Sequence, residues 1–273
     1  MKYLNSHAKG GDTYNHYIIA NEINDSILIF GSSRAIHHYN PKIIEDSINL
    51  PVYNVGLDGN GILYNYSRLL SIINRYSPKI IIYDIMPSAD MSSDDYSKYL
   101  QWQKRLYEIP GINEVFNDIN PMEKIKMRSN LYKYNSSFLQ IISDNIRPMQ
   151  EISYKGFKPL EGLIDYEPKD TIFTYTQHWD PLKFKYFQKF VDICKENNIQ
   201  LIIGYSPWYK KENSDLFKEF NLFANKNNLI IIDLCADNEL SFNPNFFVDE
   251  THMNNTGAEV FTKKFISILK DSL

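Results

Sequence analysis

Five short apolar segments, separated by stretches long enough for a helix, constrain the fold of this sequence more than any other feature. They cover residues 26–30, 52–56, 79–85, 199–205 and 229–234. Most of them run without polar interruption, as strands do when helices cover both faces of a sheet. The stretches between them carry helix signals over residues 41–48, 61–76, 180–197, 214–225 and 256–270.

Strands that alternate with helices predict a mostly parallel, doubly wound sheet. We therefore expect a flavodoxin-like three-layer α/β/α sandwich with five parallel strands in the order 2-1-3-4-5. In such a fold, ligands bind at the carboxyl ends of the strands. At 273 residues, the chain is long enough for one such domain.

Residues 86–179 do not fit this alternation. The segment is long, polar and aromatic, and a structureless loop of that size is unusual inside a compact domain. We interpret it as a largely helical insertion after the third strand, within a single domain of residues 1–273. We expect helices near residues 94–107, 121–126 and 130–144, leaning over the strand ends as a lid or substrate wall.

Composition excludes several classes of function. The net charge is −4 and no Lys/Arg stripe or basic tail occurs, so nucleic acid is not an expected partner. No metal-ligand spacing is present, and neither a metal nor an organic cofactor is expected. The two cysteines, Cys194 and Cys235, each adjoin an apolar segment and are expected to be buried free thiols.

Two serines follow the first predicted strand directly, in the segment Gly31-Ser32-Ser33-Arg34. A serine is a weak nucleophile unless a base lies beside it. Near the other end of the chain, Asp249 and His252 stand three residues apart in a loop before the last helix. That spacing lets a carboxylate orient an imidazole whose other nitrogen faces a serine, as in a catalytic triad. The alternative is a purely structural role, in which the serines only form a turn.

These segments resemble the conserved blocks of the SGNH (GDSL-type) hydrolases. "IFGSSRA" is similar to the first block, with Ser33 in the place of the nucleophile. "NVGLDGNG" is similar to the second, with Gly59 as an oxyanion-hole donor, and "DETHMN" to the fifth, giving Asp249 and His252. The resemblance implies that the N–H groups of Ser33 and Gly59 bind the oxyanion.

The third block departs from the family pattern, which places an asparagine in the oxyanion hole. Here Ser88, in "MPSAD", stands at that place. A hydroxyl is a looser donor than an amide, and loss of one oxyanion donor costs on the order of 10²–10³ in rate.

Further residues are candidates for contacting a substrate. They are Arg34, Asn60, His178, Tyr205 and Trp208. The aromatic pair ends the fourth predicted strand, where flat rings suit sugars, although packing explains it equally well. Arg34 either binds an anionic group or pairs with a carboxylate such as Asp84. The neighbouring histidines His37 and His38 are expected to be solvated.

The substituted third block and the large insertion resemble one branch of the superfamily. Its members act on acyl groups of cell-envelope or exported polysaccharides, beside membrane-bound O-acyltransferases, and face away from the cytoplasm. The resemblance implies an extracytoplasmic protein whose N-terminal anchor precedes residue 1, although a cytosolic location stays open because the start of the chain lacks a signal-peptide apolar region.

The sequence leaves two main functions open. The first is a serine esterase or O-acyltransferase that acts on acyl, foremost acetyl, esters of a carbohydrate. The second is a non-catalytic, carbohydrate-binding partner of a membrane O-acyltransferase, which the substituted third block favours. A flavodoxin-like nucleotide binder has little support, because "GLDGNG" follows the second strand and lacks an acidic partner.

Overall fold

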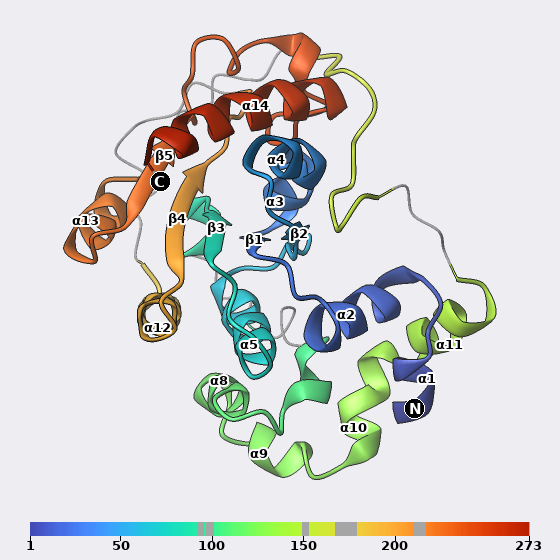
Figure 1. Ribbon diagram of the computed structural model, residues 1–273. Helices are drawn as coiled ribbons and strands as arrows, with labels where there is room; N and C mark the ends of the chain where they lie inside the picture. The colour runs from blue at the N-terminus through green and yellow to red at the C-terminus, as the bar shows by residue number, and fades with distance from the viewer. Residues whose placement is uncertain (92–95, 97–100, 149–152, 167–178, 210–216, 273) are drawn as a thin grey trace.

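The computed structural model describes residues 1–91, 96, 101–148, 153–166, 179–209 and 217–272. Five parallel strands form one sheet in the order β2-β1-β3-β4-β5, which confirms the predicted topology (Figure 1). The strands are β1 (Ile27–Phe30), β2 (Val52–Asn54), β3 (Ile80–Asp84), β4 (Gln200–Tyr205) and β5 (Ile230–Asp233). All residues of β1 and β3 are buried, as their unbroken apolar sequences require.

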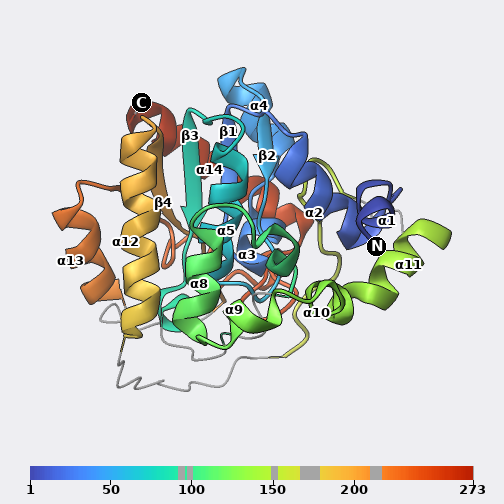
Figure 2. The same cartoon turned by 90° about the horizontal axis from the view of Figure 1, so that it is seen from below.

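Helices cover both faces of the sheet. One face carries α3 (Ser33–His38), α4 (Pro41–Ile48) and α14 (Asn255–Ser272). The other carries α5 (Ile62–Ile73), α12 (Pro181–Glu196) and α13 (Lys218–Lys226). Figures 1 and 2 show α14 on one side of the strands and α5 and α12 on the other. The three-layer sandwich is therefore the observed architecture.

Local capping explains where two of these helices begin. The Asn40 side chain accepts a hydrogen bond from the Lys42 N–H at 3.0 Å, and Pro41 occupies the first turn of α4. The Asp180 side chain accepts from the Leu182 N–H at 2.8 Å, again before a proline. A capping side chain followed by proline satisfies free N–H groups and presets the backbone for a helix.

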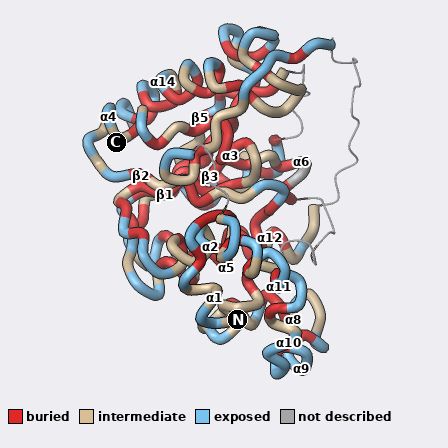
Figure 3. Tube along the Cα trace, turned by 90° about the vertical axis from the view of Figure 1, so that its right-hand side faces the viewer, coloured by how far each residue is buried: buried red, intermediate tan, exposed pale blue. Residues whose placement is uncertain are grey.

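The described part of the insertion is mostly helical, as expected, but most of the predicted helix 94–107 up to residue 100 lies outside the described residues and its later part forms only a short 3₁₀ helix. It contains α6 (Pro87–Asp90), a 3₁₀ helix at Gln103–Leu106, α8 (Ile112–Ile119), α9 (Glu123–Lys126), α10 (Asn130–Tyr134), a 3₁₀ helix at Asn135–Ser137 and α11 (Phe138–Ile146). The sequence did not predict α8. Of these elements, α8 and the 3₁₀ helix Gln103–Leu106 pack on α5, and α11 packs on the unpredicted N-terminal helices α1 (Lys2–Ser6) and α2 (Gly11–Asn21). Figure 3 shows that α9 and α10 are exposed on their outer side, whereas β1 and β3 are buried.

Helix α8 and the 3₁₀ helix Gln103–Leu106 thus lie outside α5, whereas the described residues 153–166 return to the sheet. Their backbone bonds to β2, where the Asn54 N–H donates to the Lys155 carbonyl at 2.8 Å, and to α3, where the Lys158 N–H donates to the Ile36 carbonyl at 3.2 Å. The expected wall over the strand ends remains a prediction, because parts of residues 86–179 lie outside the described ranges. Within those ranges, no helix is long and apolar enough to cross a membrane.

Candidate active site

Ser33 lies at the carboxyl end of β1, as the first residue of α3. The chain reaches it through Gly31, which has φ 140° and lies against β3. A Cβ at this position would stand 2.6 Å from the Asp84 carbonyl oxygen and 2.8 Å from the Ala35 Cβ. Only glycine permits this backbone and this close approach. The glycine therefore fixes the sharp turn that presents Ser33 at the edge of the sheet.

The structure brings Ser33, His252 and Asp249 together from opposite ends of the chain. Nε2 of His252 lies 2.8 Å from Oγ of Ser33. Nδ1 of the same imidazole lies 2.8 Å from Oδ2 of Asp249 and 3.0 Å from Oδ1. All three distances are those of hydrogen bonds, and the order of the three groups is that of a serine nucleophile, a base and an orienting carboxylate.

Asp249 is held as an anion. Partial burial opposes its charge, but hydrogen bonds from the His252 imidazole and from the backbone N–H of Thr251 and His252 outweigh burial and hold the pKa of the Asp249 carboxyl well below its usual range. Thr251 adds a hydroxyl hydrogen bond to Oδ1 at 3.0 Å. With the carboxylate accepting at Nδ1, the neutral imidazole presents a lone pair at Nε2 to the serine.

A turn after β2 carries the proposed oxyanion donor Gly59. The Asn60 N–H closes the turn on the Leu57 carbonyl at 3.1 Å, and Gly59 stands at its third position with φ 66°. Within the described ranges, the N–H groups of Ser33 and Gly59 donate to no other protein group. Both are therefore available to a bound oxyanion. Ser88 is the second residue of α6, and its side chain lies outside the described part of the chain.

Asn54, at the end of β2, joins this turn to the helix of the nucleophile. Its Nδ2 donates to the carbonyls of Ala35 at 2.6 Å and Tyr39 at 3.2 Å, and its Oδ1 accepts from the Gly56 N–H at 3.2 Å. The sequence placed Asn54 at the start of the second block but gave it no role. Its amide therefore ties Gly56, three residues before Gly59, to the helix that begins at Ser33.

Arg34 lies under the site rather than in it. The residue is 2% exposed, and its Nε donates to Oδ2 of Asp84 at 3.2 Å, the pairing that the sequence left open. Asp84 also accepts from the Tyr39 hydroxyl and from the Ser206 N–H. The expected substrate contact of Arg34 is therefore wrong for this structure, because a buried carboxylate holds the guanidinium.

Tyr205 and Trp208 are also corrections, since both are core residues. Tyr205 is 1% exposed, and its hydroxyl donates to Asn221 of α13 at 2.8 Å. Trp208 is 4% exposed and donates its Nε1–H to Sγ of Cys235. Successive side chains of a strand face opposite sides of a sheet, and the last residue of β4 faces the layer of α12 and α13. Neither ring can stack on a substrate in this arrangement.

Two substrate candidates remain, Asn60 and His178. Asn60 is 8% exposed and donates to the Asp58 carbonyl of its own turn at 2.8 Å, so it does not face an incoming substrate. His178 lies in residues 167–178, which the structure does not describe. Cys194 and Cys235 are both buried and neither forms a disulfide, as predicted.

His37 and His38 are buried, which contradicts the expectation that both are solvated. The His37 ring meets the His252 ring edge to face at 5.7 Å, and its Nδ1 lies 2.7 Å from the Lys158 carbonyl. Its Nε2 lies 3.4 Å from Asp58, and this contact lowers the pKa of the Asp58 carboxyl. The short helix α3 turns both rings inward, and no local sequence signal indicates this.

Fold and site together define a three-layer α/β/α protein with a Ser-His-Asp arrangement at the carboxyl edge of its sheet. Neither the known protein-family models nor the curated proteins contain a match to this chain. In the described ranges, no group of three or more His, Cys, Asp or Glu side chains is arranged as metal ligands would be.

Solved structures similar to this chain are GDSL-type lipolytic proteins and acylhydrolases. One, from Desulfitobacterium hafniense, is assigned to the G-D-S-L family and is 13% identical, with a TM-score of 0.46 over 90% of this chain and 99% of its own. A lipase/acylhydrolase from Enterococcus faecalis is 13% identical, with a TM-score of 0.41 over 90% and 96%. An acetyl-xylooligosaccharide esterase from Geobacillus Stearmophilus is 12% identical, with a TM-score of 0.43 over 89% and 93%. All three TM-scores are below 0.5.

Proposed function

We propose that this protein is a serine esterase of the SGNH type. One observation carries the proposal: His252 lies within 2.8 Å of both the Ser33 hydroxyl and the Asp249 carboxylate. A serine, an imidazole and a carboxylate in this order activate the hydroxyl for attack on an ester carbonyl. The motifs "GSSR", "NVGLDGNG" and "DETH" provide independent support, since they resemble three blocks of that superfamily.

The geometry supports a two-step acyl transfer. The Ser33 Oγ attacks the acyl carbonyl while Nε2 of His252 takes its proton, and the N–H groups of Ser33 and Gly59 bind the oxyanion. His252 then gives the proton to the departing alcohol oxygen, leaving an acyl ester on Ser33. In the second step, water or another alcohol attacks this ester, His252 takes its proton, and the serine hydroxyl is restored. Asp249 keeps its charge throughout and stabilises the imidazolium.

The finer proposal concerns the substrate. His252 and Asp249 have side chains that are 25% and 44% exposed, so the reacting groups are open to solvent and admit an acyl group carried on a bulky alcohol. Together with the resemblance of the third block and insertion to a polysaccharide-acting branch, this favours an acyl, foremost acetyl, ester of a carbohydrate. Transfer to a sugar, an extracytoplasmic location and a membrane O-acyltransferase as partner belong to the same proposal.

Labelling with a fluorophosphonate probe tests the serine, because only an activated hydroxyl reacts with it. Ser33→Ala should abolish labelling and reduce hydrolysis of p-nitrophenyl acetate by on the order of 10³-fold or more. Ser32→Ala is the matched control, because the adjacent Ser32 makes no side-chain capping bond to α3. Its labelling should remain at the wild-type level. Absent labelling of the folded wild type would favour the non-catalytic, carbohydrate-binding alternative.

The substrate class requires a separate comparison. We expect a higher kcat/KM for release of acetate from an acetylated oligosaccharide than for hydrolysis of p-nitrophenyl acetate. The value for p-nitrophenyl acetate is first corrected for its better leaving group. Ser33→Ala serves as the blank for both substrates. A fully active serine that releases no acetate from any acetylated oligosaccharide would leave the esterase proposal standing and overturn the carbohydrate proposal.

A further inference from the structure

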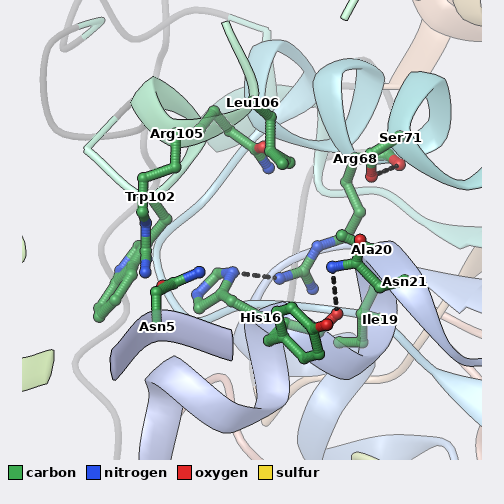
Figure 4. A pocket seen from close by; sticks show the side chains of 12 residues that line it. Asn5, His16, Ile19, Ala20, Asn21, Arg68, Ser71, Trp102, Arg105 and Leu106 are labelled. Carbon is green, nitrogen blue, oxygen red and sulfur yellow. Dashed lines mark hydrogen bonds between the residues drawn. The ribbon is translucent and has the colours of Figure 1, made fainter. Parts of the chain in front are cut away.

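A small cavity outside the catalytic site is lined by an unusual set of basic and amide side chains. It lies between α2, α5 and the 3₁₀ helix Gln103–Leu106 (Figure 4). Its volume is about 30 Å³, which exceeds the space that a single ordered water needs. Its lining residues include His16, Arg68, Trp102, Gln103 and Arg105. None of the described residues that line it is acidic.

Arg68 and His16 form the inner wall of this cavity. Arg68 is 3% exposed; its Nη1 donates to the Val55 and Gly56 carbonyls, and its Nη2 lies 2.9 Å from Nδ1 of His16. A guanidinium can only donate, so Nδ1 of His16 accepts and the proton of the neutral imidazole is on Nε2. That Nε2 is buried and has no partner among the described residues. The cavity therefore contains an unsatisfied N–H donor.

Arg105 supplies the outer wall. Its guanidinium lies over the Trp102 ring at 5.1 Å, and Trp102 stacks on His16 with centroids 4.5 Å apart. Figure 4 shows Arg105 and Arg68 approaching His16 from two sides. Both Nη1 and Nη2 of Arg105 are buried without a partner in the described ranges. Burial lowers the pKa of Arg105 to about 10, so the group is still charged near neutral pH.

Two of the amide side chains in the lining also have an unsatisfied oxygen. The Oδ1 of Asn5 and the Oε1 of Gln103 are likewise buried without a partner. Turning an amide by 180° exchanges its oxygen for an NH₂ group, so both side chains can donate into the same space. A buried cation and a buried donor left unsatisfied each cost free energy, and here they gather around one empty space.

We propose that this cavity binds a small oxyanion, a carboxylate or phosphate group. The planar fork of Arg105 matches two oxygens of such a group, and the Nε2–H of His16 supplies a third hydrogen bond from the facing wall. The proposal is independent of the esterase function, since the cavity contains none of Ser33, Asp249 and His252. The simpler alternative is that ordered water satisfies these donors.

The experiment is a thermal unfolding titration of the full chain with sodium phosphate, and separately with sodium acetate, at constant ionic strength. A ligand that binds only the native state raises the midpoint in a saturable way. We expect a saturable rise with at least one of the two anions. Arg105→Gln should weaken that anion's apparent affinity at least tenfold. A rise with phosphate alone indicates a phosphate group as the ligand, and one with acetate alone a carboxylate.

Arg128→Gln is the matched control, because it removes the same charge from an exposed site in the same insertion. It should retain the wild-type response. No saturable rise with either anion, or equal responses in wild type and Arg105→Gln, would overturn the proposal in favour of ordered water or general ionic effects.

A second measurement on the wild type avoids any dependence on variant folding. The imidazole nitrogen signals of His16, followed by NMR, should shift saturably with the anion, since Nε2–H gains an acceptor. The exposed His7 provides the internal control and should show no saturable shift. If the His16 signals do not respond at anion concentrations that raise the midpoint, the anion binds elsewhere and the proposal is wrong.

Discussion

The backbone N–H of Met253 donates to Nε2 of His38 at 2.9 Å, so a buried imidazole holds the residue that follows His252. Nδ1 of His38 lies 2.9 Å from the Ser206 hydroxyl, at the end of β4. Because Nε2 accepts, the proton of the neutral ring is on Nδ1. His38 thus links α3, β4 and the loop of the base, and acts as a positioning residue.

The first prediction concerns the pH dependence of stability. Burial, followed by the charges of Arg34 and neighbouring histidines, lowers the pKa of His38 well below its usual value. Below pH about 6.5, the unfolded chain binds a proton at this position that the native protein does not. The free energy of unfolding should therefore fall with decreasing pH, by up to about 1.4 kcal/mol per pH unit for this group.

His38→Gln should remove that part of the slope between pH 6.5 and 5, measured by denaturant unfolding at each pH. His16, whose pKa burial also lowers, should retain its own contribution in the variant. His7→Gln changes an exposed histidine and should leave the slope unaltered. Identical slopes in the wild type and His38→Gln would contradict the assignment of a neutral buried His38.

The second prediction concerns Asp249→Asn. An amide can no longer stabilise the imidazolium, so kcat for p-nitrophenyl acetate should fall by on the order of 10³–10⁴ while KM changes little. Since the native pKa of Asp249 is depressed, its contribution to stability is present above pH about 4 and is lost as the pH falls below it. The stability difference between wild type and variant should shrink below pH 4; a constant difference would speak against the charged pair.

The third prediction concerns the amide of Asn54. Asn54→Ala leaves the carbonyls of Ala35 and Tyr39 without their donor and should cost about 1–3 kcal/mol of stability. It should also slow fluorophosphonate labelling, because Gly56, three residues before Gly59, is no longer tied to α3. The exposed Asn225 on α13 offers the control, and Asn225→Ala should change neither property. Destabilisation with an unaltered labelling rate would show that Asn54 does not position the oxyanion turn.

The fourth prediction separates strain from collision at two glycines. Gly31→Ala combines an unfavourable φ of 140° with a Cβ 2.6 Å from the Asp84 carbonyl, whereas Gly162→Ala has a φ of 116° and its nearest neighbour is Val248 at 3.9 Å. Backbone strain alone costs about 1–3 kcal/mol. Gly162→Ala should show only this loss, and Gly31→Ala a larger one with loss of esterase activity. Equal losses at the two positions would refute the close packing of the nucleophile turn.

The strands of the sheet could be predicted from the sequence because buried parallel strands have continuous apolar segments. Residues 79–85 and 199–205 were therefore recognisable as β3 and β4. The pairing of Ser33 with His252 was predictable for a related reason, since the order of the strands brings their carboxyl ends to one edge. Helix α8 escaped prediction because it lies inside a long polar segment whose packing partner, α5, is distant in the chain.

The errors near the site share one physical cause. Whether a side chain at a strand end faces solvent or a helical layer depends on the pleat, and one residue of register reverses the answer. Tyr205 and Trp208 looked suitable for sugars because of their type, yet both face the core. The opposite error occurred at His37 and His38, whose polarity suggested solvent although α3 directs both rings inward.

The bond between Asn54 and Lys155 has a consequence for the outer margin of the sheet. Tyr154 and Phe157 exchange two backbone hydrogen bonds of 3.0 Å across Lys155 and Gly156, and this tight reverse turn lies against β2. An uncovered outer strand is a template on which another chain can add, and thereby a seed for aggregation. Here the turn occupies that template, and Lys155 is secured by ion pairs to Asp25 and Glu45 at 2.8 and 2.6 Å. Shortening the insertion past this turn would therefore produce insoluble protein before any change in substrate preference could be measured.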